Sequence, residues 1–244
     1  MTYEPRTYRS QVDATNLVSF QVVLAETDLQ VSALSDLSAQ ALALVRELRV
    51  ELESYIAAHP RFMESHVPID VAPGAPVLAR EMGDAARIAG VGPMAAVAGA
   101  FAEAVARGLA ADSAEVIVEN GGDLYLIGTI ERTVLLSAGD SPLSEKVALV
   151  VSAELMPVAV CTSSAKVGPS VSYGGAHAVT ILAENGALAD AAASSVGNIV
   201  HGPDDISAGL ERAKSIPGVL GAVIIAGDRI GATGLARLAS VPRG

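Results

Sequence analysis

The sequence is poor in aromatic residues and has one cysteine. Phe, Tyr and Trp make up 3% of the 244 residues, and Trp is absent. Because 51% of the residues are hydrophobic, a large core can still form, built from Ala, Val, Leu and Ile. Cys161 has no second thiol for an internal disulfide, which fits a reducing compartment and predicts a cytoplasmic location. No His or Asn partner pattern accompanies Cys161, so we expect a buried, inert thiol.

Basic clusters and long apolar runs are also missing. The net charge is −11 and no run of Lys and Arg stands out, so nucleic acid is not an expected partner. The apolar stretches are broken by Gly or charge, and none reads as about 20 continuous lipid-facing residues. The first residues show no apolar signal region. We therefore expect no membrane insertion. An anionic ligand stays open, since backbone N–H groups can hold a phosphate despite the negative net charge.

Hydrophobic periodicity predicts one α+β domain over residues 1–244. Some predicted strands follow one another directly, as in a meander, and others are separated by helices. This order favours α+β over a doubly wound sheet. The architecture expected is antiparallel or mixed sheets packed with Ala-rich helices. The predicted strands are 17–24, 29–33, 116–118, 124–127, 131–137, 146–153, 156–162, 177–182, 219–225 and 229–232. Those at 131–137, 146–153 and 156–162 are expected to continue the sheet that contains 116–118 and 124–127. The predicted helices are 35–58, with Ser35 able to cap its start, 77–88, 93–109, 188–200 and 206–214.

The segment Asn120-Gly121-Gly122-Asp123 lies between two apolar runs, which is a strong hairpin signal. Adjacent glycines allow positive φ angles and let a ligand approach the backbone closely. Asp123 could then accept a hydrogen bond from a base or a ribose. A plain hairpin turn explains the same residues without any ligand.

Two further segments carry groups suited to a phosphate and a cation. Thr162 and Ser163 end a strand and open a Gly/Ser-rich loop at 165–175, which suits phosphate contact but also a simple polar loop. Asp190, Ser194 and Asn198 are spaced i, i+4 and i+8 on a helix, so they share one face. Such oxygen ligands suit Mg²⁺ held jointly with substrate phosphates. A solvated helix face, or Asp190 capping a neighbouring turn, is the alternative.

The histidines give weaker signals. No pair among the four has the spacing of a zinc site. His177 stands at the head of a predicted strand beside the glycine-rich loop, where it could serve as a general base. A surface or capping histidine is the alternative.

These segments occur in the order used by the ApbE family, the FAD:protein FMN transferases. ENGGDLYLIG resembles that family's Asn-x-Gly-Gly-Asp segment, CTSS its Thr-Ser-Gly segment and ADAAASS its Ala-Asp-Ala-x-x-Thr segment. The pieces TYRSQV, ETDLQV and GPSVSYGGAHAVTI look more like a shorter branch of that superfamily. The resemblance implies that a flavin nucleotide is held by Asn120, Gly121, Gly122, Asp123, Thr162 and Ser163. It also implies that Asp190 and Ser194 bind Mg²⁺.

The sequence departs from the family pattern in the parts that serve transfer. Where the family has its Ala-Lys-Gly segment, residues 95–99 read Ala-Ala-Val-Ala-Gly and contain no lysine. The family's Tyr-Glu-Arg segment and His-Ile-x-Asp-Pro-x-Thr-Gly loop are absent. The resemblance therefore implies a protein that binds FAD or a related nucleotide with Mg²⁺ and transfers poorly. The implied reactions are FMN or nucleotidyl transfer, with a protein acceptor, and cleavage of the FAD pyrophosphate. The alternatives are a flavin or nucleotide carrier without catalysis and a structural protein that assembles, for instance as a homo-oligomer, through its Ala-rich helices.

Overall fold

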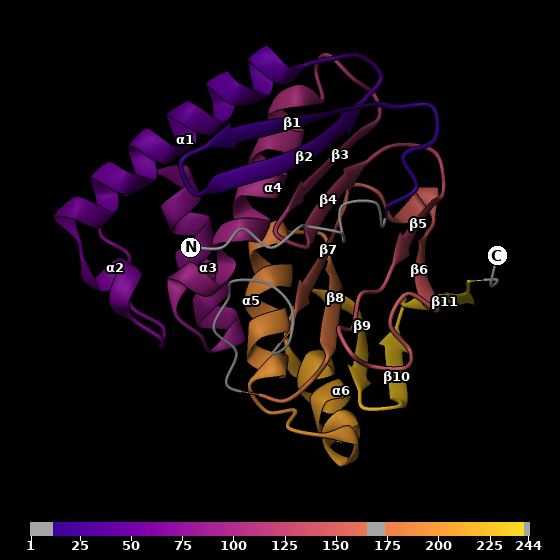
Figure 1. The fold of residues 1–244 in the computed structure, drawn as a ribbon. Helices are drawn as coiled ribbons and strands as arrows, with labels where there is room; N and C mark the ends of the chain where they lie inside the picture. The colour runs from indigo at the N-terminus through magenta and orange to yellow at the C-terminus, as the bar shows by residue number, and fades with distance from the viewer. Residues whose placement is uncertain (1–11, 165–173, 242–244) are drawn as a thin grey trace.

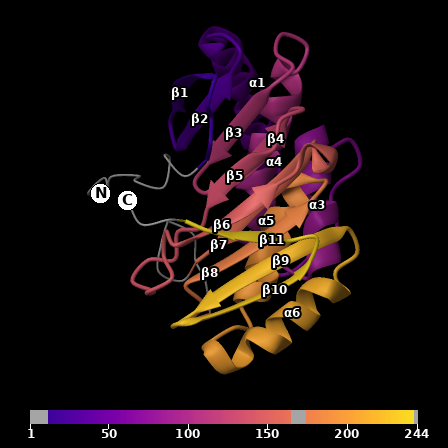
Figure 2. The same cartoon turned by 90° about the vertical axis from the view of Figure 1, so that its right-hand side faces the viewer.

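The computed structural model describes residues 12–164 and 174–241. The chain forms three layers, with helices on one face of a large sheet and a small sheet on the other (Figures 1 and 2). Every strand pair in the described ranges is antiparallel. The α+β class predicted from sequence is therefore confirmed.

The large sheet has eight strands in the order β1-β2-β3-β4-β7-β8-β9-β10. Neighbouring strands of the large sheet follow one another in the chain. Helices lie between β2 and β3 and between β8 and β9, and two strands of the small sheet lie between β4 and β7. The strands of the large sheet are β1 (Val18–Leu24), β2 (Thr27–Ala33), β3 (Val116–Asn120), β4 (Asp123–Ile127), β7 (Val158–Ser163), β8 (Ala178–Ala183), β9 (Val219–Ala226) and β10 (Arg229–Gly234).

The small sheet has three strands in the order β11-β6-β5: β5 (Arg132–Leu135), β6 (Val147–Val151) and β11 (Arg237–Ser240). The sequence pattern placed 131–137 and 146–153 in one continuing sheet, and this expectation is wrong. Val134 of β5 and Leu149 of β6 pack on the outer face of the large sheet instead of extending its edge. Strand periodicity is the same in both arrangements, so it could not distinguish them.

The helices cover the other face of the large sheet. They are α1 (Ser38–Ala58), α2 (Arg61–Glu64), α3 (Val77–Ala89), α4 (Val97–Leu109), α5 (Gly186–Gly197) and α6 (Ile206–Ser215), with short 3₁₀ turns η2 (Pro93–Ala96), η3 (Ala153–Leu155) and η4 (Pro203–Asp205). α1 packs on β1, α4 on β3 and β4, α5 on β7 and β8, and α6 on β9 and β10. No single helix of the described chain is both long and apolar enough to cross a bilayer; α3 with the η2–α4 segment meets both criteria only as a pair, bent by 102°.

The predicted helices are confirmed, with shifted ends. The helix expected at 188–200 spans Gly186–Gly197. The helix expected to start at Ser35 starts at Ser38, after Leu37, and Asp36 Oδ1 accepts a hydrogen bond from the Ser38 N–H at 2.9 Å. The Asp36 side chain thus satisfies one of the free N–H groups of the first turn, which is the role expected of Ser35.

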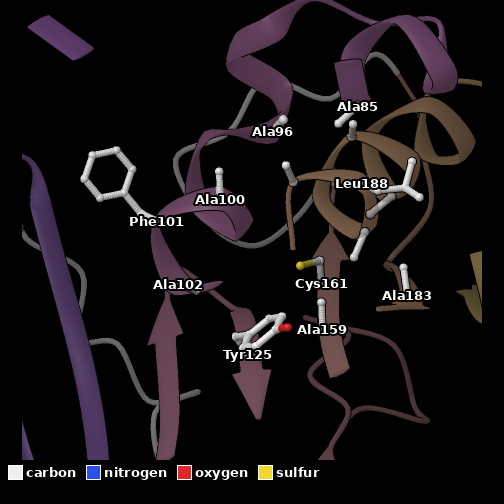
Figure 3. Close-up of a cluster of buried hydrophobic side chains, with 14 of the residues drawn as sticks. Ala85, Ala96, Ala100, Phe101, Ala102, Tyr125, Ala159, Cys161, Ala183 and Leu188 are labelled. Atoms are coloured by element: carbon white, nitrogen blue, oxygen red, sulfur yellow. The ribbon is translucent and has the colours of Figure 1, made fainter. Parts of the chain in front are cut away.

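Alternation along the strands divides the core into two clusters on the two faces of the large sheet. Val116 and Val118 face the helices, whereas Ile117 between them faces the small sheet. Figure 3 shows part of the helix-side cluster, where Ala side chains from the helices meet Tyr125, Ala159 and Cys161 of the strands. The Cys161 side chain is fully buried, as predicted.

The Ala- and Gly-rich composition of α4 and α5 lets their backbones touch. A Cβ atom added to Gly99 would lie 2.1 Å from the carbonyl oxygen of Gly186, and a Cβ added to Gly186 would lie 2.3 Å from the carbonyl oxygen of Gly99. Only glycine fits at either position. This close contact brings the first turns of α4 and α5 together.

Candidate functional site

The turn between β3 and β4 is the hairpin that the sequence predicted. Asn120 pairs with Asp123 across it, and Gly121 and Gly122 have φ angles of +67° and +102°. Positive φ at both central residues is typical of a type I′ turn. Glu119 Oε1 accepts a hydrogen bond from the Gly122 N–H at 2.7 Å. A Cβ at either glycine would meet no atom within 4 Å, so the space beside the turn is open to a ligand.

Asp190 caps the start of a neighbouring helix. α4 follows Ala96, whose side chain provides no hydrogen bond to the first turn. Asp190 Oδ2 instead accepts hydrogen bonds from the N–H groups of Ala98 and Gly99, both at 3.0 Å. The positive end of the α4 dipole faces this carboxylate and stabilises its charge. This is the capping role that the sequence left open beside the metal role. Oδ1 accepts no hydrogen bond from the described residues.

Asn120 and Asp123 of the β3–β4 hairpin also lie at the N-terminus of α4. The side-chain amide of Asn120 donates to the Ala98 carbonyl oxygen at 3.1 Å, beside the N–H group that Asp190 holds. Asp123 Oδ1 accepts a hydrogen bond from the Thr162 N–H at 3.0 Å. The structure thus brings Asn120, Asp123 and Asp190 together at the N-terminus of α4, although they come from distant parts of the sequence.

The electrostatics of the two carboxyls are unusual. Burial raises the pKa of Asp190 to about 7, against the lowering effect of the Gly99 and Ala98 N–H groups. Burial, followed by the charge of Asp190, raises the pKa of Asp123 well above its usual range. Burial and the two carboxylates also raise the pKa of the Cys161 thiol. Within the described ranges no basic side chain pairs with either carboxyl, so a bound cation would relieve their repulsion.

This arrangement predicts a pH-dependent stability. The folded protein holds the Asp190 proton with a pKa of about 7, against an ordinary value of 3.8. The folded state therefore binds more protons than the unfolded chain between these values, and Asp190 lowers the stability increasingly as the pH rises through that window. We expect Asp190→Asn, which cannot ionise, to flatten the fall in the free energy of unfolding from about pH 5 to pH 8. Urea titrations at several pH values measure this. Asp84→Asn, at the exposed Asp84–Arg87 pair, should follow the wild type; parallel curves for all three proteins would contradict the prediction.

Thr162 and Ser163 are adjacent in the chain but face opposite sides of the sheet. Thr162 Oγ1 shares a hydrogen bond with Thr180 Oγ1 at 2.9 Å on the small-sheet side. Ser163 follows the alternation of Cys161 and faces the helices. Thr162 also lines a cavity of about 50 Å³ between the two sheets, together with Glu119, Gly121, Gly122, Leu124 and Ser164. The family resemblance assigned Asn120, Asp123, Thr162, Ser163, Asp190 and Ser194 to one nucleotide and Mg²⁺ site; the sheet separates the Thr162 hydroxyl from the carboxyls.

Ser194 lies one turn after Asp190 on α5. It is half-buried, and its hydroxyl makes no hydrogen bond to any residue that the structure describes. The next residue, Ser195, instead accepts hydrogen bonds from Arg212 at 3.2 and 3.0 Å. The backbone carbonyl of Ser194 accepts the Asn198 N–H at 3.0 Å. Ser194 therefore keeps a hydroxyl available beside Asp190, as the predicted metal role requires.

His177 is held away from this cluster. Its Nδ1 accepts a hydrogen bond from the Gly227 N–H at 3.1 Å, and its Nε2 lies 3.1 Å from Asp140 Oδ1. Because Nδ1 is an acceptor, the ring proton of the neutral imidazole sits on Nε2 and points to Asp140. Neither nitrogen has a free lone pair in this arrangement. The structure thus gives His177 the capping role that the sequence offered as the alternative to general-base catalysis.

The residues at α4 fit Mg²⁺ better than a transition metal. Mg²⁺ uses one or two carboxylates and completes its shell with waters and substrate phosphates. Asp190 and Asp123 supply carboxylates, and Ser194 a hydroxyl. In the described ranges no group of three or more His, Cys, Asp or Glu side chains is arranged to hold a metal ion, as a zinc site would need. The loop predicted at 165–175 for phosphate contact falls mostly outside the described residues.

Sequence reasoning missed Glu103. Its Oε2 accepts a hydrogen bond from the Gly186 N–H at 2.6 Å, and its Oε1 lies 2.7 Å from Arg107 Nε. It is a buried carboxylate in the apolar helix α4. The sequence signal that could have identified it is a single acidic residue in a helix made mostly of Ala and Val.

Comparisons with known proteins agree with this fold. The family model described as AbpE bacteria matches residues 9–228. A UPF0280 protein of Methanopyrus kandleri is 42% identical over 227 residues, which are 89% of this chain and 91% of the relative. A UPF0280 protein of Methanocaldococcus jannaschii is 41% identical over 196 residues, or 78% and 80% of the two chains.

Solved structures extend the comparison to the fold. The flavin transferase ApbE from Vibrio cholerae matches with a TM-score of 0.57 at 13% identity, covering 89% of this chain and 96% of that one. The flavinyl transferase ApbE of Pseudomonas stutzeri matches with a TM-score of 0.54 at 15% identity, covering 89% and 93%. At these identities the likeness concerns the fold. The chain belongs to the family described as AbpE bacteria, a branch that has the UPF0280 proteins as relatives and shares the fold of the ApbE flavin transferases.

Proposed function

We propose that this protein binds FAD or a related nucleotide together with Mg²⁺ and acts at its pyrophosphate, by FMN or nucleotidyl transfer or by cleavage. The observation that carries the proposal is the pair of carboxyls, buried Asp123 and half-buried Asp190, at the N-terminus of α4 beside an open glycine turn. No described basic side chain neutralises these two carboxyls, so their charge is available to a bound cation. The shared fold with flavin transferases supports the choice of nucleotide.

Each residue has a role in this proposal. Gly121 and Gly122 leave room for the nucleotide to approach the backbone. Asp190 and Ser194 would hold Mg²⁺, with Asp123 beside them; when bound, the ion neutralises negative charge on the phosphates. The N–H groups of Ala98 and Gly99 fix the Asp190 carboxylate, and Asn120 fixes Ala98. The acceptor that we propose for transfer is a hydroxyl group, for example on a protein.

A carrier that binds the nucleotide without turnover is the second candidate. It is favoured by the engagement of both ring nitrogens of His177, which leaves the only predicted base without a lone pair. An assembly role for the Ala-rich helices is less well supported, because the small residues of α4 and α5 are already buried inside the protein.

Two measurements separate these functions. Mass spectrometry of small molecules released from the purified protein should detect a flavin or an adenine nucleotide; their complete absence, with no heat on mixing FAD and Mg²⁺ with the protein, would argue against binding. Incubation with FAD, Mg²⁺ and a hydroxyl-bearing protein acceptor should release AMP if the protein is an enzyme, because the acceptor hydroxyl, or water in the case of cleavage, attacks the phosphorus nearer the flavin and AMP leaves. FAD should stay intact if the protein is a carrier.

Asp190→Asn should weaken Mg²⁺-dependent binding of FAD by about 1–3 kcal/mol, the usual effect of losing a hydrogen-bonding or ionic contact of a charged group. The asparagine keeps one oxygen for the α4 N–H groups but no negative charge for the ion. Isothermal titration calorimetry with and without Mg²⁺ measures the change. The matched control is Asp84→Asn, at an exposed carboxylate paired with Arg87 on α3, which should bind as the wild type does. Equal affinities for all three proteins would rule out Asp190 as a ligand.

A further inference from the structure

Helices α4 and α5 cap each other. Asp190 of α5 accepts the N–H groups of Ala98 and Gly99 in the first turn of α4 at 3.0 Å. In return, Glu103 of α4 accepts the N–H of Gly186, the first residue of α5, at 2.6 Å. Between the two carboxylates the backbones touch at Gly99 and Gly186. One carboxylate from each helix therefore caps the other helix, and the glycine contact lies between the two caps.

Glu103 is itself held on its other side. Arg107 Nε lies 2.7 Å from Glu103 Oε1, and the side chain of Glu103 is 10% exposed against 53% for Arg107. Arg107 also donates to the Tyr125 hydroxyl at 2.6 Å, and Tyr125 donates to the Glu184 carbonyl oxygen at 3.2 Å. This chain of contacts links α4, β4 and the residues before α5. It leaves the second oxygen of Glu103 fixed on Gly186.

We propose that Glu103 is a positioning residue for the Asp190 carboxylate, acting through the first turn of α5. This inference rests on the proposed cation and nucleotide site. Asp190 lies four residues, about one turn, beyond Gly186, so a shift of the first turn of α5 moves Asp190 relative to Ala98, Gly99 and Asp123. Glu103 does not touch the site and acts only on the geometry of its ligands.

The alternative is that Glu103 only stabilises the fold. A buried N–H group left without an acceptor destabilises the protein in either case, so stability cannot distinguish the two roles. The affinity of the site for a cation can, because it depends on where Asp190 stands. Removing a group that orients a metal ligand lowers metal affinity by about 10- to 100-fold in other sites.

The test uses Mn²⁺ as the probe and electron paramagnetic resonance as the measurement, on the full chain. Glu103→Ala should weaken Mn²⁺ binding about 10- to 100-fold. Glu103→Gln keeps an oxygen for the Gly186 N–H but loses the pair with Arg107, so it should recover part of the affinity. The stability control is Val105→Ala, a fully buried position in the same helix whose apolar side chain makes neither capping hydrogen bond; it should lower the melting temperature without changing the affinity.

The outcomes are distinct. Equal Mn²⁺ affinities for Glu103→Ala, Val105→Ala and the wild type would overturn the inference and leave the proposed function standing. No Mn²⁺ binding by the wild type would instead defeat the proposed cation site. The inference is then decided by nuclear magnetic resonance of the Ala98 and Gly99 amides, which report on the Asp190 contact. These resonances should shift in Glu103→Ala and stay in place in Val105→Ala; unmoved resonances in both would overturn it.

Discussion

Gly99→Ala should lower the free energy of unfolding by about 3 kcal/mol or more, at the upper end of what overpacking costs. Helix propensity alone predicts the opposite, since Ala stabilises a helix interior by about 1 kcal/mol relative to Gly. The difference arises because the new Cβ would lie 2.1 Å from the Gly186 carbonyl oxygen, where only backbone atoms could yield. Separating the helices to make room would also break the Asp190 and Glu103 caps. Urea unfolding at equilibrium measures the change.

Gly108→Ala in the same helix is the control for this prediction. Its Cβ would meet Leu44 Cδ1 at 2.6 Å, at the far end of a flexible side chain that can move away. The effect should therefore be small, with the gain in helix propensity offsetting part of the crowding. Equal losses for the two variants would show that the glycine contact between α4 and α5 is not special.

Arg132→Ala should destabilise the protein by about 3–5 kcal/mol, the usual result of breaking a buried ion pair by removing one partner. Arg132 Nη2 lies 3.0 Å from Glu115 Oε2, and the two side chains are 3% and 8% exposed. Arg132 also donates to the carbonyl oxygens of Asp13 and Thr15 at 3.2 Å, which fixes the segment before β1. Without it, the Glu115 charge stays buried, and among the described residues its remaining donors are the Thr129 N–H and hydroxyl.

Arg237→Ala provides the matched control. Arg237 on β11 pairs with Glu131, but both side chains are more than half exposed. Exposed pairs contribute about 0–1 kcal/mol. Denaturant titrations of the two variants should therefore differ by several-fold in the lost free energy. A loss below about 1 kcal/mol for Arg132→Ala would contradict the argument from burial.

Local sequence patterns were sufficient for most elements of this fold. The glycine pair 121–122 with apolar runs on both sides predicted the β3–β4 hairpin, and the Ala-rich run around Asp190 predicted α5. Both signals depend on residues close together in the chain. The assignment of β5 and β6 to a second sheet depends on contacts with distant strands, and no local pattern carries it. Strand β11 itself was not among the predicted strands, and its pairing with β6 likewise depends on contacts between distant parts of the chain.

The candidate site shows the same limit. Asp190 was predicted to be a metal ligand from its spacing to Ser194 and from the family resemblance, but its partners Ala98 and Gly99 stand 92 and 91 residues away. The face of the Thr162 side chain follows from strand alternation, yet only the structure shows that Thr180 holds it. Glu103 was not recognised, because its partner Gly186 lies 83 residues further on. Spacing identifies which groups can share a helix face, and tertiary packing decides what they contact.

The order in which the small sheet is assembled bears on how the chain matures during synthesis. β5 and β6 emerge from the ribosome long before β11, which pairs with β6 along the register Arg237↔Val150 to Ser240↔Val147. Until the last strand arrives, β6 presents an unpaired edge, and such edges recruit other chains. Domains fold as translation proceeds, so this interval is a period of exposure. A nascent chain stalled before residue 237 would therefore be prone to aggregate through β6.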